Sequence, residues 1–179
     1  MAAVVVLADD RDPLRDDLDK CVPGGWWHTT DQLRTTEGQD QTHTLLQTFQ
    51  APDETCVIVD KTTIDDADKD GEIARETALG RLLTEVHQAT HGLHPKVNLA
   101  VIEERRENSK NNRDRRVRST LVQQGTIGSS FQLASVSPGS EHLLWLPDLV
   151  CSAYRQKMLF HRTGYFSEIE DLTRVLELQ

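Results

Sequence analysis

The stretch EHLLWLPDLVCSAYRQKM, residues 141–158, predicts a helix that lies in the core of the protein. Its first half is largely apolar, which leaves little room for a hydrated face. Pro147 limits where the helix begins, because proline is tolerated in a first turn and disrupts later turns. Asp148 is then a carboxylate in an apolar setting, so it must be paired, hydrated in a cleft or bound to a metal. Its place in the first turn also suits a structural role, since the helix dipole favours an anion there.

The segments outside this helix alternate between strand and helix patterns. Strands are predicted at residues 1–8, 55–60, 97–102 and 131–136. Helices are predicted at residues 13–21, 39–50, 72–91, 113–124 and 166–178, and a short strand is one interpretation of residues 26–30. Such alternation is typical of an α/β fold with a partly parallel sheet. We therefore expect one α/β domain over residues 1–179, with a mixed sheet flanked by helices.

Composition restricts the partners and the compartment. The net charge of −9 repels nucleic acid, so any contact with a polyanion must come from a local patch. No apolar segment approaches the about 20 residues that cross a bilayer, and the first residues do not form a signal peptide, so we expect no membrane partner. Three cysteines without metal-ligand spacing indicate reduced thiols and a cytoplasmic location.

Acidic residues follow two of the predicted strands. Asp60 ends one of them, and Glu103 and Glu104 follow another. Because the carboxyl ends of parallel strands meet at one edge of a sheet, we expect these acids to converge there with Asp148. Mg²⁺ and Mn²⁺ take oxygen ligands, and two such ions promote phosphoryl transfer. The sequence therefore predicts four catalytic acids, with Asp60, Glu103 and Asp148 as metal ligands. The alternative is that they are ordinary solubilising residues.

Residues 105–118 form a basic segment in this acidic chain, with seven basic and two acidic side chains. The segment begins beside the predicted metal ligands, where cations hold phosphates on either side of a cut. The residues predicted to contact nucleic acid are Arg105, Arg106, Lys110, Arg113 and Arg116. The alternative is a solvent-exposed helix face with charge pairs one turn apart.

Two further metal patterns are incomplete. Residues 66–73 match the first part of a calcium-binding loop, but Thr77 stands where the pattern requires a glutamate. His87, His91 and His94 follow helical spacing, but the glutamate of the zinc-binding His-Glu-x-x-His pattern is missing. Neither pattern by itself defines a calcium or a zinc site.

Five of these segments together resemble a bacterial RNase H-like domain-of-unknown-function family, whose members usually begin with an Asp-Glu-Ser strand. The matching segments are AAVVVL (2–7), HTTD (28–31), VIVDK (57–61), VNLAVIEERREN (97–108) and LLWLPDLVCSAYR (143–155). The resemblance implies an RNase H-like fold and metal-dependent processing of nucleic acid. It places Asp148 as the acid of the final helix and Glu103 or Glu104 as the acid at a strand end. Asp60 and Lys61 would line the same rim.

The sequence departs from that family at its start, because no Asp-Glu-Ser strand is present. A buried strand with no residues before it also predicts that a preceding segment is missing. Two hypotheses follow. The first is a nuclease or nucleic-acid processing protein that uses Mg²⁺ or Mn²⁺. The second is a catalytically inactive RNase H-like module for binding or assembly, whose exposed sheet edge invites a homodimer or a strand from a partner.

Overall fold

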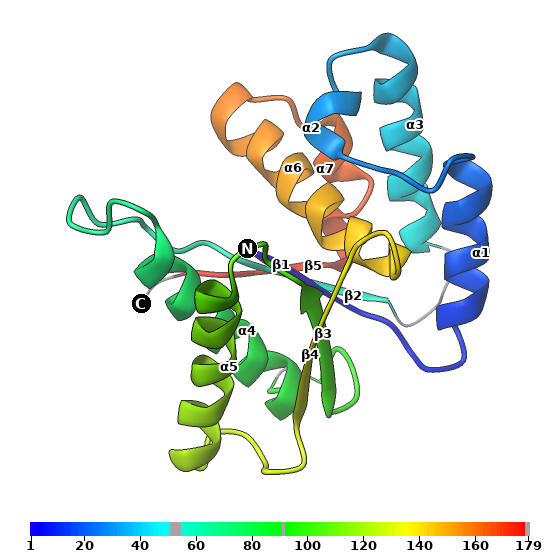
Figure 1. Cartoon of the computed structure of the whole chain (residues 1–179). Helices are drawn as coiled ribbons and strands as arrows, with labels where there is room; N and C mark the ends of the chain where they lie inside the picture. The colour runs from blue at the N-terminus through cyan, green and yellow to red at the C-terminus, as the bar shows by residue number, and fades with distance from the viewer. Residues whose placement is uncertain (51–54, 91, 178–179) are drawn as a thin grey trace. The chain divides into compact units, whose positions relative to one another are not determined.

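The structure is a computed structural model that describes residues 1–50, 55–90 and 92–177. Helices and strands alternate in it, which confirms the predicted α/β class (Figure 1). One sheet has three strands in the order β1-β2-β5, and β3 and β4 form a separate two-stranded sheet. The described residues divide into two compact units. We call residues 2–59 with 138–174 the α6 unit, and residues 60–137 with Met1 and the segment from Val175 the α5 unit.

The α6 unit is built around the helix predicted from residues 141–158. Its helices are α1 (Arg11–Cys21), α2 (Thr29–Gln32), α3 (Thr36–Gln47), α6 (Trp145–Phe160) and α7 (Gly164–Ser167). Strand β1 (Ala2–Val5) pairs antiparallel with β2 (Cys56–Asp60), with Ala2 opposite Val59 and Val5 opposite Cys56. Helix α6 buries five side chains at helical spacing, namely Trp145, Leu146, Leu149, Val150 and Ala153. The opening stretch is therefore a core helix, as its pattern predicts.

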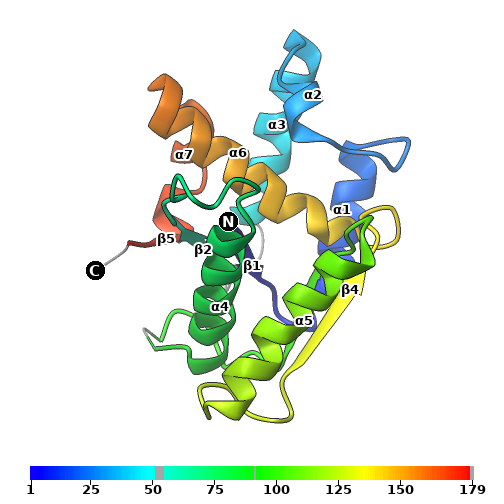
Figure 2. The same ribbon diagram turned by 60° about the vertical axis from the view of Figure 1, so that its left-hand side comes forward.

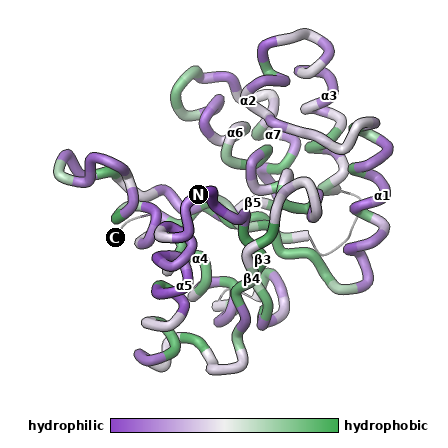
Figure 3. Tube along the Cα trace, in the orientation of Figure 1, coloured by the Kyte–Doolittle hydropathy of each residue, from purple (hydrophilic) through white to green (hydrophobic). Residues whose placement is uncertain are grey.

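The α5 unit contains a strand–helix–strand arrangement. Strand β3 (Leu99–Glu103) pairs in parallel with β4 (Gln132–Val136), and α5 (Asn108–Gln123) connects them. Helix α4 (Glu72–Gln88) lies beside α5, as Figure 2 shows. The two strands are mainly hydrophobic, whereas α5 begins with hydrophilic residues (Figure 3). Helix α5 therefore packs on α4 with one side and exposes polar residues on the other.

Three of the local predictions are wrong. The predicted helix at 166–178 is instead α7 followed by β5 (Thr173–Leu176), and residue 178 lies outside the described part of the chain. The amide of Lys61 donates to the carbonyl of Leu176 at 3.1 Å, and such ladder bonds favour the extended form of a short segment with β-branched residues. The short strand at 26–30 is absent: residues 26–28 belong to neither a helix nor a strand, and α2 begins at Thr29. The first strand is half-buried rather than central, because β1 is at one end of its sheet.

The other predicted strands and helices are present with shifted ends. Within the residues described, none of the helices has both the length and the apolar composition that a membrane crossing requires.

Candidate functional site

Asp60, the first of the predicted metal ligands, is engaged in an ion pair within the α5 unit. Its side chain is 0% exposed at the end of β2, and its Oδ2 lies 3.1 Å from Nε of Arg81. The N–H of Arg81 is not aligned on that oxygen for a hydrogen bond, so the contact is mainly electrostatic. Thr62 donates its hydroxyl to Oδ1. A buried carboxylate with a guanidinium beside it already has the positive charge that a metal ion would supply.

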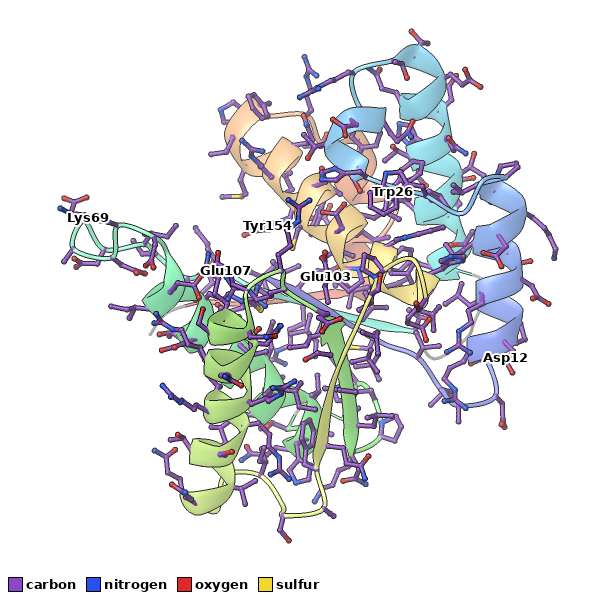
Figure 4. All side chains as sticks on the ribbon, viewed as in Figure 1. Asp12, Trp26, Lys69, Glu103, Glu107 and Tyr154 are labelled. Atoms are coloured by element: carbon purple, nitrogen blue, oxygen red, sulfur yellow. The ribbon has the colours of Figure 1, made fainter. Side chains whose placement is uncertain are left out.

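Two further predicted acids are Glu103, the last residue of β3, and Glu104, which follows it. Both are exposed (Figure 4 labels Glu103). The prediction that they share a sheet edge with Asp60 is wrong, because β3 pairs with β4 and β2 pairs with β1 and β5. The apolar pattern of a strand identifies the strand but does not identify its neighbours, which explains the error. In the ranges that the structure describes, no three His, Cys, Asp or Glu side chains converge as cation ligands.

Asp148 belongs to the α6 unit, where it is exposed and holds the start of α2. Its Oδ2 accepts hydrogen bonds from the amide of Thr29 at 3.2 Å and from the hydroxyl of Thr29 at 2.7 Å. That hydroxyl also accepts a bond from Nε1 of Trp27 at 2.9 Å. The amide of Thr29 is one of the first N–H groups of α2, which a helix cannot satisfy internally. This geometry supports the structural alternative for Asp148.

Three of the seven basic side chains in residues 105–118 form ion pairs with acidic side chains on α4. Glu72, whose side chain is 6% exposed, accepts a bidentate pair of hydrogen bonds from Arg105, one of them at 2.8 Å. Lys110 lies 3.9 Å from the same carboxylate, and Arg113 donates to Glu76 at 2.6 Å. Three of the five predicted nucleic-acid contacts, Arg105, Lys110 and Arg113, are therefore committed to intramolecular ion pairs.

Asp114, which no motif singles out, is the most deeply buried acid of this network. It is 0% exposed and accepts hydrogen bonds from Arg75 at 3.2 Å and 3.0 Å, with Nη1 of Arg105 at 3.9 Å. Asn111 is also buried, and its side chain bridges the amide and the carbonyl of Arg105 at 2.8 Å each. Asp114 is the one acid among the arginines of α5, but no local pattern in the sequence identifies Arg75 as its partner.

The ion pair of Glu72 makes the stability of the α5 unit depend on pH. Hydrogen bonds from Arg105 hold the pKa of Glu72 below its ordinary value of 4.5. A depressed pKa in the folded state stabilises the fold above the unfolded pKa, and this stabilisation is lost as the pH falls through the folded value. We expect the urea concentration at the unfolding midpoint to decrease when the pH is lowered below about 4.5, in a series measured from about pH 7 to about pH 3. Glu72→Gln should lower the urea midpoint at neutral pH. It should also flatten the acid limb, by which we mean the decrease of the midpoint at low pH.

The matched control for that measurement is Asp66→Asn, which removes an exposed acid from the loop before α4. It should leave both the neutral midpoint and the acid limb close to those of the wild type. An acid limb that is equally steep in Glu72→Gln and in the wild type would contradict the assignment to Glu72.

Helix α5 exposes no acid. Its carboxylate, Asp114, is wholly buried, so each charged side chain that the helix exposes is positive. Arg115 and Arg116 are exposed, and Arg106 is exposed just before the helix. Arg115 donates to the side chain of Asn112 at 3.1 Å. Within the described residues, neither Arg106 nor Arg116 has an ion-pair partner. Arg106 and Arg116 were predicted from the sequence, and Arg115 was missed.

The incomplete metal patterns have structural roles in the residues described. Asp68 accepts hydrogen bonds from the amides of Ile73 at 3.1 Å and Ala74 at 2.8 Å, so it caps the start of α4. Lys69, the next residue, is at the end of the loop that precedes α4 (Figure 4). His87 uses both ring nitrogens. Its Nδ1 bonds to the carbonyl of Val97 at 3.0 Å, and its Nε2 accepts from the amide of Gly128 at 3.0 Å. His91 lies outside the described residues.

Comparisons with known proteins find no relative for the chain. No protein-family model, no curated protein and no solved structure matches it. The predicted membership of the RNase H-like family therefore stays a prediction. The geometry of the site does not fit a divalent cation at Asp60, because the guanidinium of Arg81 already neutralises this carboxylate.

Proposed function

We propose that the chain is a nucleic-acid-binding module that holds the phosphate backbone against the exposed face of α5. The observation that carries this proposal is the sorting of charge on α5. Its one acid is wholly buried in an ion pair with Arg75, while Arg115 and Arg116 are exposed. In a chain of net charge −9, such a face gives a polyanion a local place to bind.

The polar residues of α5 support this proposal. Before and after its run of arginines the helix exposes hydroxyl and amide side chains, namely Ser109, Asn112, Ser119, Thr120 and Gln123. Hydroxyls, amides and guanidinium groups are the side chains that most often contact phosphate and sugar oxygens. Such contacts position a protein on the backbone and carry no sequence information. We therefore propose binding that depends strongly on salt and little on sequence.

The interactions of the predicted catalytic acids Asp60 and Asp148 favour binding of nucleic acid without cleavage. The metal-dependent nuclease implied by the family resemblance needs an ionised Asp60 that is open to a metal ion. The ion pair with Arg81 occupies that carboxylate, and Asp148 holds the start of α2. The second hypothesis from the sequence, an inactive RNase H-like binding module, therefore agrees better with the hydrogen bonds of these residues.

The test is a titration of fluorescently labelled DNA and RNA, single-stranded and duplex, over a range of salt concentrations. Arg115→Ala combined with Arg116→Ala should weaken binding by about tenfold and lower the slope of log affinity against log salt by about 2. The loss should be similar for different sequences, because backbone contacts do not distinguish bases.

The matched control is Arg11→Ala combined with Arg34→Ala, which removes two other exposed arginines, both from the α6 unit. This variant has the same net charge as the α5 variant. Equal losses in the two variants would assign the binding to net charge and would refute the α5 face. A wild type that binds none of the four nucleic acids at low salt would also refute it.

A further inference from the structure

The C-terminal end of α6 leaves three consecutive apolar side chains exposed. Met158 is 42% exposed, Leu159 is 62% exposed and Phe160 is 53% exposed. Consecutive residues of a helix point in directions about 100° apart, so no single core-facing stripe can bury all three. The helix ends at once afterwards, because His161 takes a left-handed conformation and the amide of Arg162 donates to the carbonyl of Gln156. We call Met158, Leu159 and Phe160 the apolar tip.

The surroundings of the apolar tip are positive. Residues 155–167 contain three basic side chains and no acid. Arg155 lies one turn before Met158 and Leu159, on the same face of the helix, and Arg162 follows the tip. Both arginines are exposed, and neither has an ion-pair partner in the described part of the chain. Lys157 is different, because it pairs with Glu170 and lies over the ring of Phe166.

From this combination we infer that the end of α6 docks on an anionic phospholipid surface, with the apolar tip among the acyl chains and Arg155 and Arg162 at the headgroups. Apolar and aromatic side chains that enter the boundary between headgroups and acyl chains, with basic residues beside them, are the usual elements of a peripheral contact. The apolar segments of the sequence predicted no membrane partner, because none of them is long enough to span a bilayer. A surface contact does not need that length.

The arrangement of the tip favours a lipid surface over a protein groove. A helix that docks in a groove presents anchors at i, i+3, i+4 and i+7 along one face. The three tip residues instead point to different sides of the helix end, and a groove that accepted one would leave the next in water. A fluid apolar phase surrounds all three. The adjacent arginines complement the negative headgroups, which attract each basic residue independently of a fixed geometry.

The test is co-sedimentation of the full chain with large vesicles, either of phosphatidylcholine alone or of phosphatidylcholine and phosphatidylglycerol in equal parts. We expect the protein to pellet with the anionic vesicles and to be released by salt. Leu159→Asp should weaken the partition by about tenfold or more, since it removes an apolar contact and adds a negative charge. Leu93→Asp is the control, because Leu93 is exposed to a similar degree, 56%, in the α5 unit.

A second pair of variants tests the charges. Arg155→Ala combined with Arg162→Ala should weaken the partition by about thirtyfold, which corresponds to about 2 kcal/mol. Arg11→Ala combined with Arg34→Ala removes the same charge outside residues 155–162 and should leave the partition nearly unchanged.

Four results of the vesicle experiments would overturn the inference. They are no binding of the wild type, equal binding to both kinds of vesicle, equal effects of Leu159→Asp and Leu93→Asp, and equal losses of binding in the two double arginine variants. If Leu159→Asp changes the sedimentation velocity of the protein in the absence of vesicles, the tip is a contact between protein copies, and the lipid assignment is wrong.

Discussion

Asp114→Ala is expected to lower the free energy of unfolding by about 3–5 kcal/mol, which is as much as the loss of a large core side chain. The carboxylate of Asp114 is 0% exposed and receives two hydrogen bonds from Arg75, with Arg105 nearby. Removing it leaves a guanidinium that is already partly desolvated without its counter-charge. Removing one partner of a buried ion pair is strongly destabilising, because the remaining charge is uncompensated. Replacing both partners by apolar residues costs far less.

A double-mutant cycle with Arg75 distinguishes this explanation from simple loss of packing. Asp114→Leu alone and Arg75→Met alone should each destabilise the fold, whereas the double variant Asp114→Leu with Arg75→Met should cost much less than the sum of these two single changes. Urea unfolding at neutral pH gives all four free energies. Asp66→Ala, at an exposed acid in the same unit, should change stability by no more than about 0.5 kcal/mol. Additive losses in the cycle would contradict the ion-pair explanation.

The Asp114 network also explains which part of the α5 region could be predicted from the sequence. Helical periodicity located α5 within a few residues, and the count of arginines identified a basic segment. Neither pattern could show that Glu72, far away in the chain, would take the charge of Arg105. Charge pairing between helices depends on how they pack, which a local pattern does not record. From the sequence, all the basic side chains of this segment therefore looked free to contact a phosphate. In the described residues, only Arg106, Arg115 and Arg116 face solvent without an ion pair.

The acids show a similar limit. The end of the strand at Asp60 was predicted correctly, because a buried apolar run that ends in an acid is a clear pattern. The sheet partners of that strand were not predictable, because several apolar strands could pair with it and tertiary packing decides which of them does. Asp148 was correctly placed at the start of α6, but its hydrogen-bond partner, Thr29, comes from a segment that one interpretation made a strand.

The sign of the stability change in Asp60→Ala separates an ion-paired acid from a metal ligand. Acids gathered for a metal repel one another when no metal is bound, so replacing one of them stabilises the metal-free protein or leaves its stability unchanged. An acid paired with arginine behaves in the opposite way. Its removal leaves Arg81 without a counter-charge and Thr62 without its acceptor. Two opposite expectations can therefore be compared in one measurement.

We expect Asp60→Ala to lower the free energy of unfolding by about 3 kcal/mol in chelator, the lower end of the usual range, because Arg81 makes no aligned hydrogen bond to the Asp60 carboxylate. Asp60→Leu with Arg81→Met should recover most of that loss. Added Mg²⁺ or Mn²⁺ should shift the urea midpoint of the wild type no more than that of Asp60→Ala, since only a ligand that binds the folded state stabilises it. A stabilising Asp60→Ala, together with a metal-dependent midpoint in the wild type alone, would instead make Asp60 a metal ligand and restore the nuclease hypothesis.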